Sequence, residues 1–112
     1  MNSSLPLEIS TADAKPIIDQ EGGCLLLDVR EQDEYDVARI DGSVLIPMSE
    51  IQSRVGELEP HKEKRIIVHC KLGGRSLQVA HWLKEQGFIQ VQNLTGGIDQ
   101  WSVEIDPDVP RY

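Results

Sequence analysis

The sequence predicts an α/β domain in three layers, in which helices flank a mainly parallel central sheet. Two observations predict it: apolar runs of strand length end in charged or polar residues, and segments with helical spacing separate these runs. Strands that alternate with helices along a chain typically form parallel sheets covered on both faces. The 112 residues suit one domain with a single core. We therefore expect one domain at 1–112, with a loose arm at 1–6 and an extended tail at 106–112.

The first half of the chain is expected to supply three strands and the helices between them. A short strand at 7–9 leads into a helix that Ser10 or Thr11 caps and that runs to about Gln20. Pro16 fits well only near the first turn of a helix, so this helix is expected to be short or to begin late. The later elements are strands at 24–30 and 42–47, a polar helix or turn at 31–40, and a helix at 49–58 with Ser49 as its N-cap.

The second half continues this alternation. The run "RIIVHC" at 65–70 is typical of a buried strand, and the helix predicted after it at 76–87 places Leu77, Ala80 and Leu83 on one stripe. Gly87 is expected to end that helix. A strand at 89–94, and a turn with a last helix at 95–105, complete the predicted elements.

Composition narrows the classes of function. The formal net charge is −8, whereas nucleic acids and anionic membranes both favour basic surfaces, so neither is an expected partner. No apolar run reaches the roughly 18 residues of a membrane span, and the start "MNSSLPLEIS" has neither the cationic nor the apolar region of a secretory signal. Cys24 and Cys70 show no disulfide or zinc spacing. We therefore expect a cytoplasmic protein with reduced thiols.

One short stretch, "CKLGGRS", combines a thiol with features that would make it reactive. Cys70 ends an apolar strand, and the ligand sites of parallel sheets lie at that edge. A free thiol has a pKa of about 8.5, yet only the thiolate is a good nucleophile. Backbone N–H groups of a tight loop, which Gly73 and Gly74 permit, would lower this pKa, as would the following helix N-terminus and the cations Lys71 and Arg75. The alternative is that Cys70 is a small buried hydrophobe.

With these residues in view, the chain resembles a single rhodanese domain, a fold of persulfide sulfurtransferases. The resemblance covers nearly the whole chain in family order and spacing. It implies that Cys70 is the nucleophile, which accepts a sulfane sulfur and holds it as a persulfide. It also implies an active loop whose amides surround the outer sulfur, formed by Lys71, Leu72, Gly73, Gly74 and Arg75 and followed by Ser76. The matching segments are "LLLDVREQDEY", "RIDGSVLIP", "IIVHCKLGGRS", "VAHWLKEQGF" and "VQNLTGGIDQW".

The length of the loop separates two chemistries. Related phosphatases of this fold carry five residues between the cysteine and the arginine, whereas the four residues "KLGG" lie between Cys70 and Arg75 here. The tighter ring suits one added sulfur atom, and a wider ring suits phosphate or arsenate. A P-loop is also disfavoured, because no Lys-Ser/Thr pair follows the glycines.

One segment departs from the family pattern. The usual stretch resembles Gly-His-Ile-Pro-Gly-Ala, and this chain has "ARIDGS" at 38–43. Arg39 stands where a histidine is common, and Asp41 stands where a proline is common. Any role of that histidine is therefore not carried over, while the loop chemistry is unaffected.

The function that the resemblance implies is sulfur transfer in two steps. Thiosulfate or a protein persulfide would sulfurate Cys70, and a nucleophilic acceptor would then remove the outer sulfur. No metal or organic cofactor is expected. The tail "WSVEIDPDVPRY" resembles the ends of rhodanese domains fused to adenylating enzymes, which implies a ubiquitin-like sulfur-carrier protein or its adenylating enzyme as a partner. The alternatives are a non-catalytic docking module of the same fold, which usually lacks the cysteine, and a cysteine phosphatase or arsenate reductase.

Several polar residues near the loop have structural interpretations. Arg75 suits either an anionic donor or loop carbonyls, because its guanidinium fits both. Ser76 is expected to cap the helix, with a hydrogen bond to the sulfur as a second role. Asp28 and Arg30 are expected to act as scaffold, with Arg30 tied to an acid such as Glu34. The remaining expectations are a packing role for His69, a core position for Cys24, and surface positions for His61 and His81.

Overall fold

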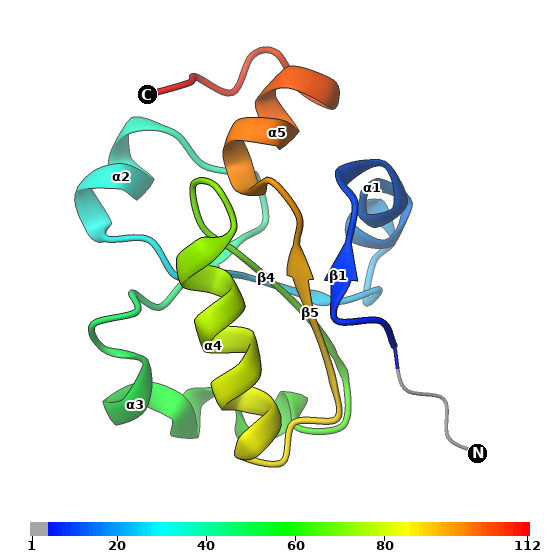
Figure 1. Ribbon diagram of the computed structural model, residues 1–112, viewed down its shortest axis with the longest axis vertical. Coiled ribbons are helices and arrows are strands. Elements are labelled where there is room, and N and C mark those ends of the chain that lie inside the picture. The colour runs from blue at the N-terminus through cyan, green and yellow to red at the C-terminus, as the bar shows by residue number, and fades with distance from the viewer. Residues whose placement is uncertain (1–4) are drawn as a thin grey trace.

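A parallel sheet forms the centre of the molecule. The computed structural model describes residues 5–112, so the first four residues of the predicted arm lie outside the described residues. The sheet has five strands in the order β1-β5-β4-β2-β3, and each pair of neighbours is parallel (Figure 1). The predicted α/β class with a mainly parallel sheet is confirmed. The strands are β1 (Glu8–Ile9), β2 (Leu25–Asp28), β3 (Val44–Leu45), β4 (Arg65–His69) and β5 (Gln90–Leu94).

Helices cover both faces of the sheet and bury two apolar clusters. In β4, Ile66 and Val68 point into the cluster beneath α3, η1 and α4, whereas Ile67 points into the cluster beneath α1 and α5. This alternation explains why the three central residues of β4, 66–68, are all apolar, since both faces of the strand are buried. The helices are α1 (Thr11–Asp19), α2 (Gln32–Val37), α3 (Ile51–Arg54), the 3-10 helix η1 (Val55–His61), α4 (Gly74–Glu85) and α5 (Gly97–Glu104).

Several element boundaries differ from those predicted. The helix expected at 49–58 divides into α3 and η1, a segment that contains Gly56 and Pro60, two residues that disfavour a continuous α-helix. Ser49 is not its N-cap, because its hydroxyl donates to the Glu31 carboxylate at 3.0 Å. The strand expected at 42–47 is reduced to two residues. In α1, Ser10 caps the helix as predicted, and Pro16 does not delay its start.

The register between β2 and β4 brings the ends of these strands together. Asp28 pairs with His69, so the segments that follow both strands start side by side at the carboxyl edge of the sheet. At this edge Arg30 is fully buried and bonds Asp28 through its Nη2, 2.7 Å from Oδ2. The same nitrogen donates to the Ala38 carbonyl at 2.6 Å. The buried pair therefore ties the end of β2 to the chain that leaves α2.

Arg30 is paired with a nearby acid, as expected, but this acid is Asp28 and not Glu34, the example named above. Arg30 Nη1 donates at 3.2 Å to the backbone carbonyl of Glu34, and its ion pair is with Asp28. Asp28 is the nearer acid and is buried with Arg30, whereas the carboxylate of Glu34 binds another residue, Arg75. The scaffold role expected for the Asp28–Arg30 pair fits this burial.

Residues 5–112 contain neither a membrane-spanning helix nor a cluster of metal-binding side chains. Within residues 5–112 no helix is long and apolar enough to cross a membrane. Over the same residues, no group of three or more His, Cys, Asp or Glu side chains is arranged to hold a metal ion.

We predict that Asp28→Ala lowers the free energy of unfolding by about 3–5 kcal/mol, because it leaves the buried guanidinium of Arg30 without its counter-charge. Urea denaturation followed by circular dichroism measures this loss. Asp41→Ala is the matched control, since Asp41 is exposed. A loss for Asp28→Ala no larger than that of the control would contradict a structural role for the pair.

Candidate functional site

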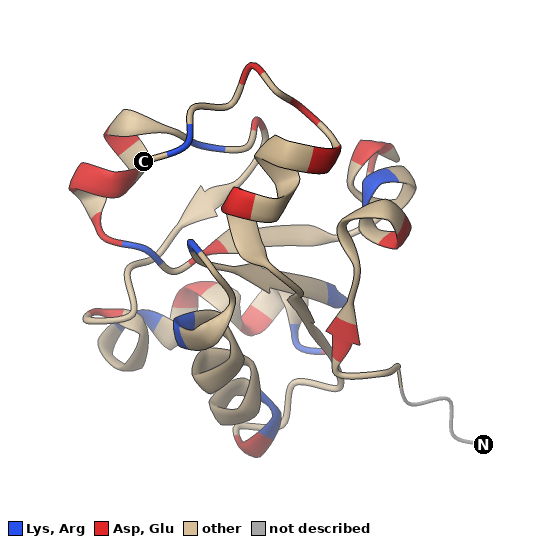
Figure 2. Cartoon of the chain, turned by 45° about the horizontal axis from the view of Figure 1, so that its top comes forward, with Lys and Arg blue, Asp and Glu red and all other residues tan. Residues whose placement is uncertain are grey.

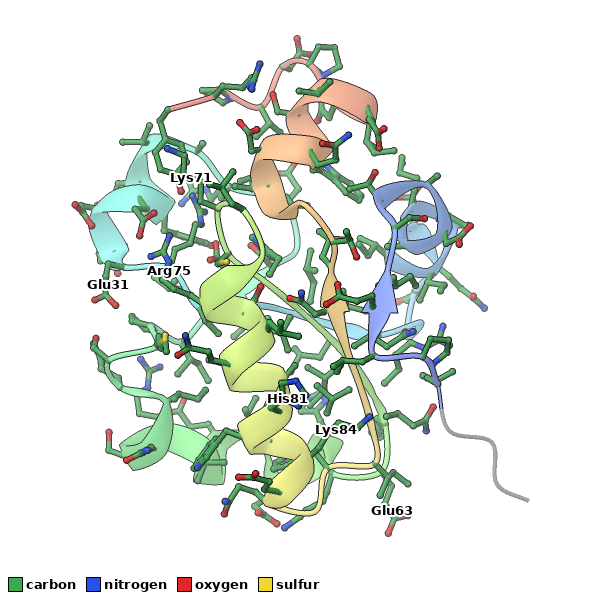
Figure 3. The ribbon with its side chains drawn as sticks, in the orientation of Figure 1. Glu31, Glu63, Lys71, Arg75, His81 and Lys84 are labelled. Carbon is green, nitrogen blue, oxygen red and sulfur yellow. The ribbon has the colours of Figure 1, made fainter. Side chains whose placement is uncertain are left out.

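The loop from Cys70 to Ser76 lies at the carboxyl edge of the sheet, between β4 and α4. Cys70 directly follows β4 and is only 1% exposed. The loop then turns outward, so that the side chain of Leu72 is 65% exposed, and returns to start α4 at Gly74. Figure 3 shows Lys71 and Arg75 on the side of the loop that faces α2. The sequence therefore placed the thiol correctly at the edge of the sheet where the loop meets a helix N-terminus.

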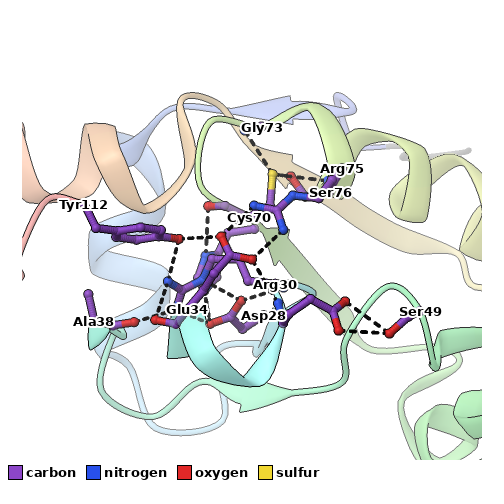
Figure 4. Close-up of polar contacts among 12 residues, drawn as sticks. Asp28, Arg30, Glu34, Ala38, Ser49, Cys70, Gly73, Arg75, Ser76 and Tyr112 are labelled. Carbon is purple, nitrogen blue, oxygen red and sulfur yellow. Dashed lines mark hydrogen bonds and ion pairs between the residues drawn. The ribbon is translucent and has the colours of Figure 1, made fainter. Parts of the chain in front are cut away.

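Hydrogen-bond donors converge on the sulfur of Cys70 (Figure 4). The N–H of Gly73 lies 3.1 Å from Sγ, and the N–H and hydroxyl of Ser76 lie 3.4 and 3.3 Å from it. Burial alone would raise the pKa of the Cys70 thiol, but hydrogen bonds from Ser76, Gly73 and Leu72 outweigh it, so the pKa falls below its ordinary value. The donors favour the thiolate because each stabilises the charged form. The predicted depression of this pKa is confirmed in direction.

The two glycines of the loop have different roles. Gly73 has a φ of 110°, in the region that side-chain-bearing residues rarely adopt, and it is the N-cap of α4. This conformation turns its N–H toward the sulfur. Gly74 is the first residue of α4, and a Cβ there would meet nothing within 4 Å. Of the two glycines expected to permit the backbone angles of the loop, only Gly73 has a positive φ.

The two cations of the loop each contact another side chain. Arg75 forms a two-pronged ion pair with Glu34 of α2, with N–O distances of 2.6 and 2.9 Å. The hydrogen bonds from Arg75 lower the pKa of Glu34 to about 2. The Nζ of Lys71 lies 4.6 Å from the ring centroid of Tyr112. The predicted bonding of Arg75 to loop carbonyls is wrong, because its guanidinium binds a side-chain carboxylate. The predicted binding of an anionic donor by Arg75 stays a prediction.

Ser76 bonds the sulfur, as expected, but it does not cap α4. It lies inside the first turn, and its hydroxyl also donates to Oδ1 of Asn93 at 2.5 Å. The orientation of the Asn93 amide is fixed, since its Nδ2 donates to Glu8 at 3.1 Å and to the Gly73 carbonyl at 3.3 Å. One hydroxyl proton thus serves two acceptors, and Asn93 competes with Cys70 for it. Sequence analysis missed Asn93; the only signal was a polar pair, Gln92 and Asn93, within a buried strand.

Helix α5 docks on the outer side of the loop. The N–H groups of Ile98 and Asp99 donate to the carbonyls of Cys70 and Lys71 at 2.9 and 3.1 Å. Gly97, with a φ of 61°, permits this approach, since a Cβ there would lie 2.4 Å from the Cys70 carbonyl oxygen. The carbonyls of Cys70 and Lys71 thus accept hydrogen bonds from α5, whereas the N–H groups of Gly73 and Ser76 face the sulfur.

Cys24 has a different environment from Cys70. It precedes β2 at the amino edge of the sheet, whereas Cys70 follows β4 at the carboxyl edge, so the two thiols lie at opposite ends of neighbouring parallel strands. Cys24 is half-buried against the cluster beneath α1 and α5. Burial raises the pKa of its thiol, and the nearby charge of Arg65 offsets this only in part. A resolving role for Cys24 is incompatible with this placement.

His69 is buried and His81 is exposed, as predicted, whereas His61 is less exposed than predicted. His69 is fully buried, with Nδ1 3.4 Å from the Cys70 carbonyl oxygen and Nε2 3.7 Å from Asp28 Oδ2. Burial lowers the pKa of His69, which favours the neutral ring. His81 is exposed on α4, as predicted, whereas His61 is half-buried. His69 therefore packs beside the loop without reaching the sulfur through any bond within residues 5–112.

Comparison with known proteins agrees with this geometry. The model of the Rhodanese-like domain family matches residues 10–104. The "Rhodanese-like/PpiC domain-containing protein 12, chloroplastic" of Arabidopsis thaliana is 42% identical over 78% of this chain and 30% of its own length. The "Putative sulfur carrier protein YrkF" of Bacillus subtilis is 41% identical over 89% of this chain and 52% of its own length. A crystal structure of a rhodanese-related protein from Thermoplasma volcanium superposes with a TM-score of 0.79 at 31% identity, over 94% of this chain and 98% of that one.

The loop, the sheet order and these matches define a rhodanese fold, in which a cysteine at the end of a central strand is enclosed by backbone amides. The chain belongs to the family of rhodanese-like domains, which includes sulfurtransferases. It spans about half of the length of YrkF and less than a third of the Arabidopsis protein, so the activities of those whole proteins are not transferred to it as findings.

We predict that Ser76→Ala moves the pH midpoint of Cys70 alkylation to higher pH, because it removes a donor that stabilises the thiolate. At neutral pH the thiolate fraction, and with it the rate, should fall. Iodoacetamide labelling against pH, resolved by peptide mass spectrometry, measures both cysteines together. Cys24 is the internal control, and its midpoint should not change. An unchanged midpoint for Cys70 would show that the hydroxyl proton remains with Asn93 throughout.

Proposed function

We propose that the protein is a sulfurtransferase that carries a sulfane sulfur as a persulfide on Cys70. The observation that supports this most directly is the convergence of the Gly73 and Ser76 N–H groups and the Ser76 hydroxyl on one buried sulfur atom. These donors stabilise the thiolate before the reaction. After the reaction, the N–H groups can donate hydrogen bonds to the second sulfur attached to the first.

The proposed cycle has two displacements. The Cys70 thiolate attacks the outer sulfur of thiosulfate or of a protein persulfide; an S–S bond forms, the donor's own S–S bond breaks, and its electron pair leaves with sulfite or a thiolate. A nucleophilic acceptor then attacks the outer sulfur of the Cys70 persulfide and releases the Cys70 thiolate. Both steps are displacements at sulfur among the donor, Cys70 and the acceptor. The proposed cycle therefore uses no metal or organic cofactor.

The proposed partners are molecules that donate sulfur to the protein or accept it. They are a sulfane-sulfur donor and, on the acceptor side, a ubiquitin-like sulfur-carrier protein or its adenylating enzyme. The resemblance of the tail and the similarity to a relative named as a sulfur carrier support this choice. We further propose that the protein acts in the cytoplasm, where the free thiols of Cys24 and Cys70 stay reduced.

Two alternatives are weaker. A docking module without activity has no need for a thiol whose pKa is lowered, as that of Cys70 is. A cysteine phosphatase needs donors for three phosphoryl oxygens, and it uses an arginine to hold them, whereas Arg75 is committed to Glu34. The short loop and this ion pair therefore both favour transfer of a single sulfur atom.

We predict a mass gain of one sulfur on Cys70 after incubation with thiosulfate or a low-molecular-weight persulfide, and its reversal by cyanide. Intact-protein mass spectrometry measures the gain, and peptide mapping assigns it. Cys70→Ser should abolish it, and Cys24→Ser, the matched control, should retain it. Mass gain that persists in Cys70→Ser would contradict the assignment. Efficient hydrolysis of an aryl phosphate by the same preparation would favour the phosphatase alternative.

A further inference from the structure

Both cations of the active loop are already engaged. Arg75 directs Nη1 and Nη2 at the two carboxylate oxygens of Glu34. Because the pKa of Glu34 is about 2, this carboxylate is charged throughout the neutral range. The pair is held in place by Tyr112, whose hydroxyl donates to Glu34 Oε2 at 2.9 Å and accepts from Arg30 at 2.9 Å. A dianion that approached Arg75 would therefore also approach a fixed negative charge.

Lys71 also lies beside a negative charge, although it forms no ion pair within residues 5–112. Its ammonium group lies over the ring of Tyr112, and the charge of Lys71 contributes to lowering the pKa of Asp99, after the larger effect of Arg111. Arg111 is itself paired with Asp99, with N–O distances of 2.9 and 3.2 Å. Figure 2 shows that acidic residues lie on both α2 and α5, the helices on either side of the loop. The net charge of −8 adds to this negative surface.

The most exposed side chain of the loop is apolar. Leu72 is 65% exposed at the tip, whereas Lys71 and Arg75 are half-buried. The donor subsite thus presents backbone N–H groups for one sulfur atom, and an apolar side chain beside them. Because Arg75 is paired with Glu34, only Lys71, half-buried over the Tyr112 ring, could offset the charge of a doubly charged leaving group among the cations of the loop.

We propose that this site selects a thiol-derived persulfide as its donor and discriminates against thiosulfate. This inference rests on the proposed function of Cys70. With thiosulfate, the thiolate attacks a dianion, a new S–S bond forms, and the electron pair of the broken S–S bond leaves with sulfite, which carries two negative charges. With a persulfide R–S–SH, the same displacement releases R–S⁻, which carries one charge, and the proton stays on the transferred sulfur. The reaction with a persulfide therefore places less negative charge beside Glu34 and Asp99 than the reaction with thiosulfate does.

The test adds an unpaired cation at the exposed tip of the loop. Leu72→Lys supplies the charge, and Leu72→Gln is the matched control, because both variants lose the leucine side chain. The rate of Cys70 persulfidation is measured by rapid quenching and mass spectrometry, with thiosulfate and with cysteine persulfide. A charge about 7 Å from a dianion in water should raise the thiosulfate rate of Leu72→Lys about tenfold over Leu72→Gln. For the persulfide, whose leaving thiolate carries one charge, the gain should be about threefold, and both gains should shrink as salt is added.

The outcomes separate this inference from the proposed function. The native protein should react faster with cysteine persulfide than with thiosulfate, and Glu34→Gln, which frees Arg75, should shift the ratio of the two rates toward thiosulfate. Equal rates for Leu72→Lys and Leu72→Gln, or a native preference for thiosulfate, would overturn the donor inference and leave Cys70 as a sulfur carrier. Failure of both donors to sulfurate Cys70 would overturn the proposed function itself.

Discussion

The structure around the active loop depends on the direction of its peptide groups. A loop whose N–H groups face a buried sulfur must turn its carbonyls outward, and buried carbonyls need partners of their own. The N-terminal amides of α5 supply partners for Cys70 and Lys71, and the Asn93 side chain supplies one for Gly73. Helix α5 and strand β5 thus hold the loop open toward one sulfur, and Gly97 lets α5 approach closely enough to do so.

A second set of contacts fixes the two arginines of the site in ion pairs. Asp28 and Arg30 form a fully buried pair at the end of β2, and Tyr112 links Arg30 to Glu34, which in turn binds Arg75. The positive charge of Arg75 is therefore balanced within the protein. The largest stabilising contributions to the Cys70 thiolate are local hydrogen bonds from Ser76, Gly73 and Leu72.

Much of this arrangement could be predicted from the sequence, because it follows from local patterns. Apolar runs marked the buried strands, and the stretch from Cys70 to Ser76 marked the loop and the start of α4. The side-chain contacts of the site that were not predicted join partners distant in sequence. Glu34 and Arg75 are 41 residues apart, and Ser76 and Asn93 are 17 apart. No local pattern distinguishes these partners from the other charged or polar residues of the chain, and only the register of the sheet brings them together.

The central inference is that the loop amides hold one added sulfur atom on Cys70. A crystal structure of the protein after treatment with cysteine persulfide tests this directly. We expect the outer sulfur to lie within the ring of loop N–H groups, at hydrogen-bonding distance from several of them, with the Glu34–Arg75 pair intact. An outer sulfur that points away from these N–H groups, or density for the added sulfur on Cys24 instead, would contradict it.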